Sequence, residues 1–196
     1  MFTGIVQATS STLRLSPSSI EIGLPDSWRD RLLVGGSVAV NGVCLTTREV
    51  GGRSFSADLS SETWSRTTFG SLRVGAGVNL ELPLSLGNGL DGHWVLGHVD
   101  AMGHVRLLAR ERDAWSLVVS FPPSAHRYIV DKGAIAVDGI SLTPFDVRED
   151  TLRCAVIPET YERTCLRERR PGDPVNLEYD ILAKYVERMM RYVRVD

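Results

Sequence analysis

Hydrophobic and polar residues alternate over short runs along most of the chain, and Gly, Pro, Asn or Asp separates one run from the next. A period of two is typical of strands that bury one face. Residues 38–40 and 43–46 flank Asn41-Gly42, a strong hairpin signal because both turn residues tolerate positive φ. Asp138-Gly139 repeats this device later in the chain. Further strands are predicted over residues 20–24, 54–59, 78–82, 116–121 and 152–157.

The two halves of the chain repeat one another at a constant spacing of 97 residues, without a gap. Residues 40–46, VNGVCLT, align with residues 137–143, VDGISLT, and Val-Asn-Leu-Glu occurs at both 78–81 and 175–178. The repeat predicts a duplicated domain of about six strands per copy, which favours a small closed barrel because closure leaves no exposed sheet edge. We expect an all-β fold of two tandem six-stranded barrels, over residues 1–93 and 94–180, followed by a C-terminal α-helix at 181–196.

The C-terminal segment changes its period. Leu182, Val186, Met189 and Val193 form one apolar stripe at helical spacing, and Asp180 is placed to cap the first turn. Arg188, Arg191 and Arg194 suit the C-terminal end of the helix dipole. The stripe allows two interpretations, a helix packed on its own barrels or a helix that associates with other copies of the chain.

Composition narrows the class of protein. The 196 residues include 22 Lys and Arg against 24 Asp and Glu, a net charge of −2, and 43% hydrophobic residues. This balance argues against nucleic-acid binding or a basic membrane-binding surface. No apolar run approaches the ~20 residues of a membrane-spanning helix, and the first residues lack the pattern of a signal peptide. We therefore expect a cytoplasmic globular protein.

The candidate metal ligands are sparse. Cys44, Cys154 and Cys165 form no CxxC pair, so reduced thiols are expected rather than a disulfide framework. His93 and His98 are five residues apart with no carboxylate at metalloprotease spacing, which is a weak zinc signal. The sequence predicts no metal site.

The faces of the two hairpins suggest where a ligand would bind. With Asn41-Gly42 as the turn, Val40 pairs with Val43 and Ala39 with Cys44, so the apolar residues share the face that must line the barrel. The other face carries small residues with hydroxyl or thiol groups, among them Cys44 and Thr46. The second hairpin repeats this with Ser141 and Thr143. Small polar residues leave room for a flat ligand and can bond to it, although an ordinary solvated strand face would look the same.

Several motifs together resemble riboflavin synthase of the alpha-chain type. They are Met-Phe-Thr-Gly-Ile-Val at the N-terminus, Asn-Gly-Val-Cys-Leu-Thr at 41–46, Gly-His at 92–93 and again in Gly-His-Val-Asp at 97–100, Lys-Gly at 132–133, Asp-Gly-Ile-Ser-Leu-Thr at 138–143, and the stretch from Asn-Leu-Glu at 176–178 to Ala-Lys-Tyr-Val-Glu-Arg at 183–188. The resemblance covers essentially the whole chain in the family's order. Pro144 departs from the family, which usually has Val there.

The resemblance implies an enzyme, a fold and an assembly. The family has two similar six-stranded Greek-key barrels that each bind one lumazine, and a C-terminal helix that assembles a homotrimer. Its reaction is the dismutation of two 6,7-dimethyl-8-ribityllumazine molecules, which gives riboflavin and 5-amino-6-(D-ribitylamino)uracil without a cofactor or metal. The site lies between the N-terminal barrel of one subunit and the C-terminal barrel of its neighbour. An association with lumazine synthase is left open.

Carried over by position, the resemblance assigns catalytic roles to Cys44, His98, Ser141 and Thr143. Cys44 is implied to act as a nucleophile or proton relay, or simply to contact the lumazine, and His98 is implied to transfer protons. Ser141 and Thr143 supply hydroxyls beside the second substrate. Asp180 matches a family acid near the site, although its capping role explains it equally well. The implied substrate-binding residues are Gly4, Ile5, Val6, Ser37, Thr46, Asp58, Leu59, Ser60, Ser61, Glu62, Thr63, Gly97, Val99, Lys132, Leu142, Ala155, Val156, Ile157, Pro158, Glu159, Thr160 and Asp180.

Two other functions remain open. The runner-up is a non-catalytic lumazine- or flavin-binding paralogue, which is expected to lose the catalytic side chains or the helix. The flavin-binding barrel of a reductase is disfavoured because no nicotinamide-binding α/β segment is found in the chain.

Overall fold

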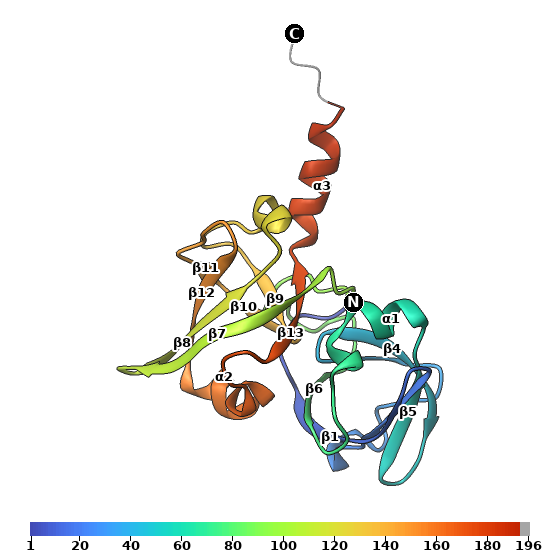
Figure 1. The fold of residues 1–196 in the computed structure, drawn as a ribbon. Helices are drawn as coiled ribbons and strands as arrows, with labels where there is room; N and C mark the ends of the chain where they lie inside the picture. The colour runs from blue at the N-terminus through green and yellow to red at the C-terminus, as the bar shows by residue number, and fades with distance from the viewer. Residues whose placement is uncertain (193–196) are drawn as a thin grey trace.

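The first half of the chain forms a closed barrel of six antiparallel strands, and the computed structural model describes residues 1–192 (Figure 1). The strand order is β1-β2-β5-β4-β3-β6, and Val38, Ile22 and Leu80 are among the fully buried residues inside. The strands are β1 (Ala8–Ser16), β2 (Ser19–Gly23), β3 (Ser37–Val40), β4 (Val43–Val50), β5 (Ser54–Asp58) and β6 (Gly77–Glu81). We call this unit barrel 1.

The second half, barrel 2, repeats that order in a seven-stranded sheet, β10-β9-β13-β7-β8-β12-β11. Its strands are β7 (Ala101–Glu111), β8 (Ala114–Ser120), β9 (Ile135–Val137), β10 (Ile140–Leu142), β11 (Pro144–Phe145), β12 (Thr151–Val156) and β13 (Pro174–Tyr179). The two ends of the sheet, β10 and β11, are consecutive parts of the segment that corresponds to β4. The predicted fold class of two β-barrels with a C-terminal helix is therefore confirmed.

Pro144 explains why this strand is divided. Its counterpart, Thr47, donates its backbone N–H to the Gly36 carbonyl at 2.9 Å and its hydroxyl to the Leu33 carbonyl. Proline has no N–H to donate. The carbonyl bond survives on both sides, because Gly35 donates to Thr47 at 2.8 Å and Lys132 donates to Pro144 at 2.7 Å. Barrel 2 thus keeps the register of barrel 1 with one ladder bond fewer.

Two long strands and two short helices were not predicted. β1 is rich in Ser and Thr, and β7 has Gly103 at a buried position where an added Cβ would meet Ser120 and Leu177, so neither strand shows a clean apolar alternation. Each barrel also has one helix before its last strand, α1 (Ser61–Arg66) and α2 (Pro158–Arg163). The remaining turns include four 3₁₀ segments, η1 (Asp26–Trp28), η2 (Thr68–Gly70), η3 (Pro123–Tyr128) and η4 (Cys165–Glu168).

The C-terminal helix α3 (Ile181–Met190) extends away from both barrels (Figure 1). Asp180 caps it as predicted, since its carboxylate accepts the N–H of Leu182 at 2.9 Å. Leu182, Val186 and Met189 are each more than 60% exposed, so most of the apolar stripe does not pack on the barrels. Val193 and Arg194 lie outside the described residues. Within residues 1–192, no helix is long and apolar enough to cross a membrane.

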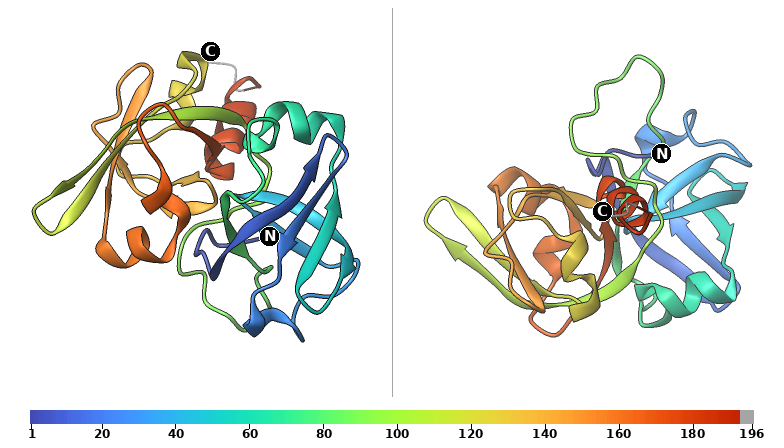
Figure 2. Two further views of the ribbon diagram at one scale, coloured as in Figure 1. Left: turned by 60° about the horizontal axis from the view of Figure 1, so that its bottom comes forward. Right: turned by 90° about the horizontal axis from the view of Figure 1, so that it is seen from above.

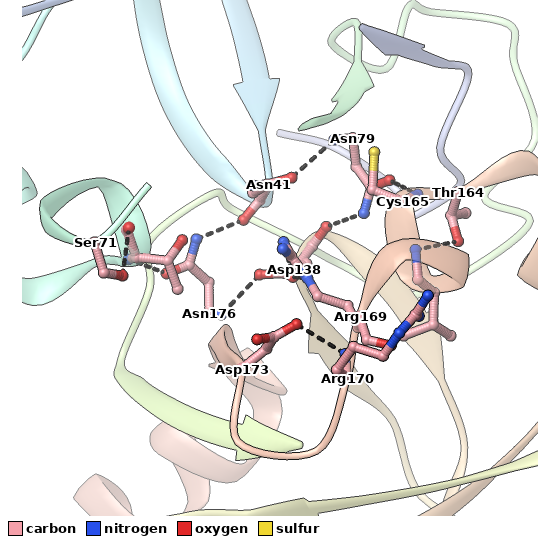
Figure 3. Close-up of polar contacts among 12 residues, drawn as sticks. Asn41, Ser71, Asn79, Asp138, Thr164, Cys165, Arg169, Arg170, Asp173 and Asn176 are labelled. Atoms are coloured by element: carbon pink, nitrogen blue, oxygen red, sulfur yellow. Dashed lines mark hydrogen bonds and ion pairs between the residues drawn. The ribbon is translucent and has the colours of Figure 1, made fainter. Parts of the chain in front are cut away.

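The barrels meet through a network of buried amides that obeys an approximate twofold symmetry (Figure 3). Asn79 donates from its side chain to the carbonyl of Asp138, and Asn176 does the same to the carbonyl of Asn41, both at 2.9 Å. The side-chain oxygens of Asn79 and Asn176 accept the N–H groups of Cys165 and Thr68. The Asn-Leu-Glu repeat found in the sequence is therefore an interface device as well as a core strand.

Gly42 and Gly139 allow this contact. Both have φ of +76°, and a Cβ on either would lie 2.7 Å from the backbone nitrogen of the other. The two hairpin turns thus touch backbone to backbone, which only glycine permits.

Candidate functional site

The two hairpins have the predicted register, with Ala39 paired to Cys44 and Ala136 paired to Ser141. The outer face is only partly open, however. Ala39 and Ala136 are buried beneath Phe2 and Val95, and Cys44 packs against this cluster. Phe2 and Val95 join the barrels by a pair of backbone hydrogen bonds of 2.7 and 3.2 Å. The face that the sequence predicted to be a ligand surface is therefore also the inter-barrel contact, and its half-buried rim is left for a ligand.

Each rim is completed by the backbone segment that leads into the other barrel. The Cys44 N–H donates to the carbonyl of Gly97, which precedes barrel 2, at 2.8 Å. The Ser141 N–H donates to the carbonyl of Gly4, which precedes barrel 1, at 2.7 Å. Both glycines have positive φ, and a Cβ on Gly97 or Gly4 would come within 3 Å of the β-carbon of Cys44 or Ser141. The polar residues of each hairpin thus lie beside backbone of the opposite barrel.

Two buried glutamates hold these crossing segments, and neither was predicted as a site residue. Glu178 accepts the N–H groups of Leu96, Gly97 and His98 at 2.6, 2.9 and 3.0 Å. Glu81, its counterpart, accepts the N–H groups of Thr3 and Gly4 and the Thr3 hydroxyl.

Each glutamate is 3% exposed. Burial raises the pKa of Glu178 to about 7 against the opposing effect of the backbone donors, and it also raises the pKa of Glu81. The sequence held one usable signal, a carboxylate repeated at the same place in two otherwise buried strands.

Cys44 is half-buried, and the residues around it come from three segments. Thr46 is exposed and pairs with the half-buried Ser37. Because Thr47 pairs with Ala57, the turn between β5 and α1 lies beside the first half of β4, which carries Thr46. Ser60 caps α1 by accepting the Thr63 N–H at 3.0 Å. The predicted residues Asp58, Ser61 and Glu62 are exposed there, whereas the Leu59 side chain belongs to the core, as does the partly buried Val99.

Ser141 has a side-chain partner, His93, that was not predicted as a site residue. Its Oγ lies 2.7 Å from Nδ1 of His93, a residue 9% exposed in the segment between the barrels. Burial lowers the pKa of His93, while the charge of Asp180 acts in the opposite direction. His98, which was predicted to transfer protons, is exposed and held through its backbone by Glu178.

The other predicted residues of barrel 2 divide into two groups. Thr143, Ala155, Ile157, Pro158 and Glu159 are exposed, and Thr160 is half-buried. The Leu142 and Val156 side chains belong to the core, against which Val6 also packs, so only the backbone of those two strand residues can face a ligand. Ile5 is 44% exposed. Lys132 is exposed at a turn with φ of +62°, and nothing places its ammonium beside Ser141.

Each barrel also has a groove at equivalent positions. In barrel 1 a groove of about 730 Å³ lies between Leu33, Gly36 and Ser37 and the connection at 82–91, which arches away from the barrels (Figure 2). In barrel 2 a groove of about 530 Å³ lies between Val130, Gly133 and Ala134 and helix α3. The same barrel edge is therefore faced by an irregular connection in one half and by a helix in the other.

The remaining thiols, Cys154 and Cys165, are buried. Burial raises the pKa of both Cys154 and Cys165 to about 12, so neither forms a thiolate near neutral pH. Over residues 1–192, no three His, Cys, Asp or Glu side chains are grouped so that they could hold a metal ion.

Comparison with known proteins agrees with this duplicated architecture. The sequence profile of the lumazine binding domain matches the chain twice, over residues 3–83 and 96–180. Riboflavin synthase of Mycobacterium tuberculosis (strain H37Rv) is 43% identical over 97% of this chain and 98% of its own length. Riboflavin synthase of Bacillus subtilis (strain 168) is 33% identical over 97% of this chain and 90% of its own length.

Solved structures share the fold. LumP complexed with 6,7-dimethyl-8-(1'-D-ribityl) lumazine superposes with a TM-score of 0.83 at 24% identity, covering 91% of this chain and 98% of LumP. LumP complexed with riboflavin gives a TM-score of 0.85. The family matches and the near full-length relatives together show that the chain belongs to the lumazine-binding family that includes the riboflavin synthases.

Proposed function

We propose that the protein is a riboflavin synthase, which converts two molecules of 6,7-dimethyl-8-ribityllumazine into riboflavin and 5-amino-6-(D-ribitylamino)uracil. The observation that carries this proposal is the near full-length similarity to riboflavin synthases of several species. The structure supports it with two equivalent polar rims, at Cys44 and at Ser141, as a reaction between two identical substrates requires. The two products contain all the atoms of the two substrates, so the chemistry calls for no oxidant, reductant or cofactor.

In the proposed reaction the protein mainly positions the two rings and moves protons. The C7 methyl group of a lumazine is acidic because the ring delocalises the resulting carbanion, and the second lumazine accepts that carbon. Holding two reactants in the correct orientation can contribute roughly 7–11 kcal/mol. Acid–base groups add a further ~10²–10⁴-fold. We assign proton transfer to Ser141, Thr143 and His98, and contact with the ring or proton relay to Cys44.

Ser141→Ala is the sharpest test of the assigned role of barrel 2. Loss of the hydroxyl removes a proton-transfer group but little contact area, so we expect turnover to fall by roughly 10²-fold or more while lumazine affinity changes by about threefold or less. Steady-state kinetics and fluorescence titration measure the two quantities. Unchanged turnover would remove Ser141 from the mechanism.

The deciding experiment for the function is incubation of the purified full chain with 6,7-dimethyl-8-ribityllumazine alone. Formation of riboflavin, followed by absorbance and chromatography, supports the synthase. Tight binding without turnover supports the alternative, a lumazine- or flavin-binding paralogue. LumP, which shares this fold, was solved in complex with 6,7-dimethyl-8-(1'-D-ribityl) lumazine.

We also propose a cytoplasmic homotrimer assembled by α3. The apolar stripe of α3 is exposed to water at Leu182, Val186 and Met189, which is energetically unfavourable. Copies of the helix would bury it, and the barrel 2 site of one subunit would face the barrel 1 site of the next.

Val186→Lys tests this assembly. A charge in a buried apolar stripe disfavours association, so we expect the variant to be a folded monomer with at most a few per cent of wild-type turnover. Light scattering coupled to chromatography measures the mass. A trimeric Val186→Lys variant, or a fully active monomer, would contradict the proposal.

A further inference from the structure

Ser141 and Cys44 occupy equivalent positions but have different surroundings. Ser141 Oγ is 2.7 Å from Nδ1 of His93. Cys44 bonds to the opposite barrel through its backbone N–H, and among residues 1–192 no side chain is hydrogen-bonded to its Sγ. The duplication therefore explains the shared backbone contacts but not the imidazole, which belongs to the Ser141 site alone.

The position of His93 is fixed by its neighbours. Its own N–H donates to the Thr3 carbonyl at 3.0 Å, and Thr3 is tied in turn to Glu81. Gly92 packs so closely that an added Cβ would meet the Thr3 carbonyl and lie 3.1 Å from the β-carbon of Ser141. The imidazole is therefore held against the serine by backbone on both sides.

The charge state of the ring suits an acceptor. Burial keeps the pKa of His93 below its usual range, so the imidazole is neutral near pH 7. A neutral imidazole with its proton on Nε2 presents a lone pair at Nδ1, to which the Ser141 hydroxyl can donate. A base within hydrogen-bond reach of a hydroxyl is the usual arrangement that activates serine.

We propose that His93 is the proton acceptor for Ser141, which makes it a positioning and proton-accepting residue of the barrel 2 site. This inference rests on the proposed riboflavin synthase function. In the step, the C–H bond of the lumazine C7 methyl group breaks and its electron pair stays on the ring as the delocalised carbanion. The methyl proton passes to Ser141 Oγ while the hydroxyl proton of Ser141 passes to His93 Nδ1. Ser141 ends neutral and His93 ends as imidazolium.

His93→Asn tests the inference, because an asparagine amide can still bond near the Nδ1 position but cannot take up the proton. The readout is deuterium uptake by the C7 methyl group of 6,7-dimethyl-8-ribityllumazine in D₂O, followed by proton NMR, alongside riboflavin formation. We expect exchange and kcat to fall about 10²-fold, with KM within about threefold of wild type. His104→Asn, a replacement of an exposed histidine on β7, is the matched control and should behave as wild type.

The partnership with Ser141 is tested by the double variant His93→Asn/Ser141→Ala. Because the two residues are proposed to act as one unit, the double variant should lose no more activity than Ser141→Ala alone. Losses that multiply would overturn the proposal, as would a His93→Asn enzyme with wild-type exchange. If His93→Asn does not fold, His93→Gln provides the same comparison.

The exchange assay also separates this inference from the proposed function. A wild-type protein that exchanges the methyl protons through His93 but forms no riboflavin would refute the synthase and retain the role of His93. A wild-type protein that forms riboflavin with exchange independent of His93 would refute the inference alone.

Discussion

Barrel 1 and barrel 2 carry different residues at the same buried position of the hairpin turn, a neutral amide in one and a charged carboxylate in the other. In barrel 1 the position is Asn41, and the residue corresponding to Arg169 is Leu72. In barrel 2 it is Asp138, whose carboxylate bonds to Arg169 at 2.7 Å, with 4% of the Asp138 side chain and 14% of the Arg169 side chain exposed (Figure 3). Both Asn41 and Asp138 still accept the N–H of the next asparagine in the network at 2.8 Å.

This difference shows which parts of the duplicated unit are constrained. The side-chain amides of Asn79 and Asn176 make the same hydrogen bonds on both sides, because the oxygen of each accepts a buried backbone N–H of the opposite barrel. The charge of the hairpin-turn residue can differ between the barrels, provided that a buried carboxylate is accompanied by a cation. Asp138 and Arg169 form such a pair, and the Asp138 charge raises the pKa of Arg169. In barrel 1 the neutral amide requires no cation, although Asn41 Nδ2 then has no partner among the described residues.

The largest expected effect comes from breaking this pair. Arg169→Leu installs the residue of barrel 1 and leaves the Asp138 carboxylate buried without its cation, so the free energy of unfolding should fall by about 3–5 kcal/mol. Asp138→Asn/Arg169→Leu copies the barrel 1 solution completely and should recover most of that loss. Urea unfolding of the three proteins measures the values. A double variant as unstable as the single one would show that the two barrels are not interchangeable here.

The crossed arrangement, in which each hairpin borders a segment of the other barrel, can be tested by substituting the glycine that contacts each hairpin. Gly97→Ala should disturb the Cys44 site and Gly4→Ala the Ser141 site, each at a cost in stability of about 2–3 kcal/mol, because both residues have positive φ and abut the opposite hairpin. Gly35→Ala is the control. It has φ of +79° but nothing within 4 Å of the added Cβ, so only the backbone cost should remain.

Calorimetric titration with 6,7-dimethyl-8-ribityllumazine then tells the glycine variants apart. Gly97→Ala and Gly4→Ala should each weaken one binding event and spare the other, whereas Gly35→Ala should spare both. Equal weakening of both events in either site variant would contradict the crossed arrangement.

A smaller effect, of the order of 2 kcal/mol, concerns the pH dependence of stability through Glu178. Burial raises its pKa to about 7 in the folded protein, so folding favours the protonated carboxyl. Its contribution is full below about pH 4.5 and is lost as the pH rises towards 7 and beyond. Glu178→Gln should flatten this decline, seen as the difference between variant and wild type in urea unfolding at pH 5 and pH 8. An unchanged slope would contradict the assignment.

Much of the architecture was predictable from local pattern. The Asn-Gly and Asp-Gly turns gave the correct pairing of both hairpins, and Asp180 was recognised as the start of the last helix. Two strands were missed for definite reasons. In β1 the inward-facing Thr12 is polar, and in β7 Gly103 occupies a core position, so the apolar alternation is interrupted in each. Cys44 and Ser141 were predicted as site residues from the sequence, whereas His93 entered only as a weak zinc ligand and within a Gly-His motif, and Glu178 only within the repeated Asn-Leu-Glu.

The sequence by itself determined that this protein is a duplicated β-barrel, with two equivalent polar hairpins and a helix with an apolar stripe, because periodicity and turn chemistry are local properties of the chain. Only the tertiary structure decided that each hairpin borders a segment of the other barrel and that one serine has an imidazole partner. These contacts join Gly97 to Cys44, Gly4 to Ser141 and His93 to Ser141. Two of them are made by backbone groups that all residues except proline carry, and the third by residues 48 positions apart, so no local pattern encodes them.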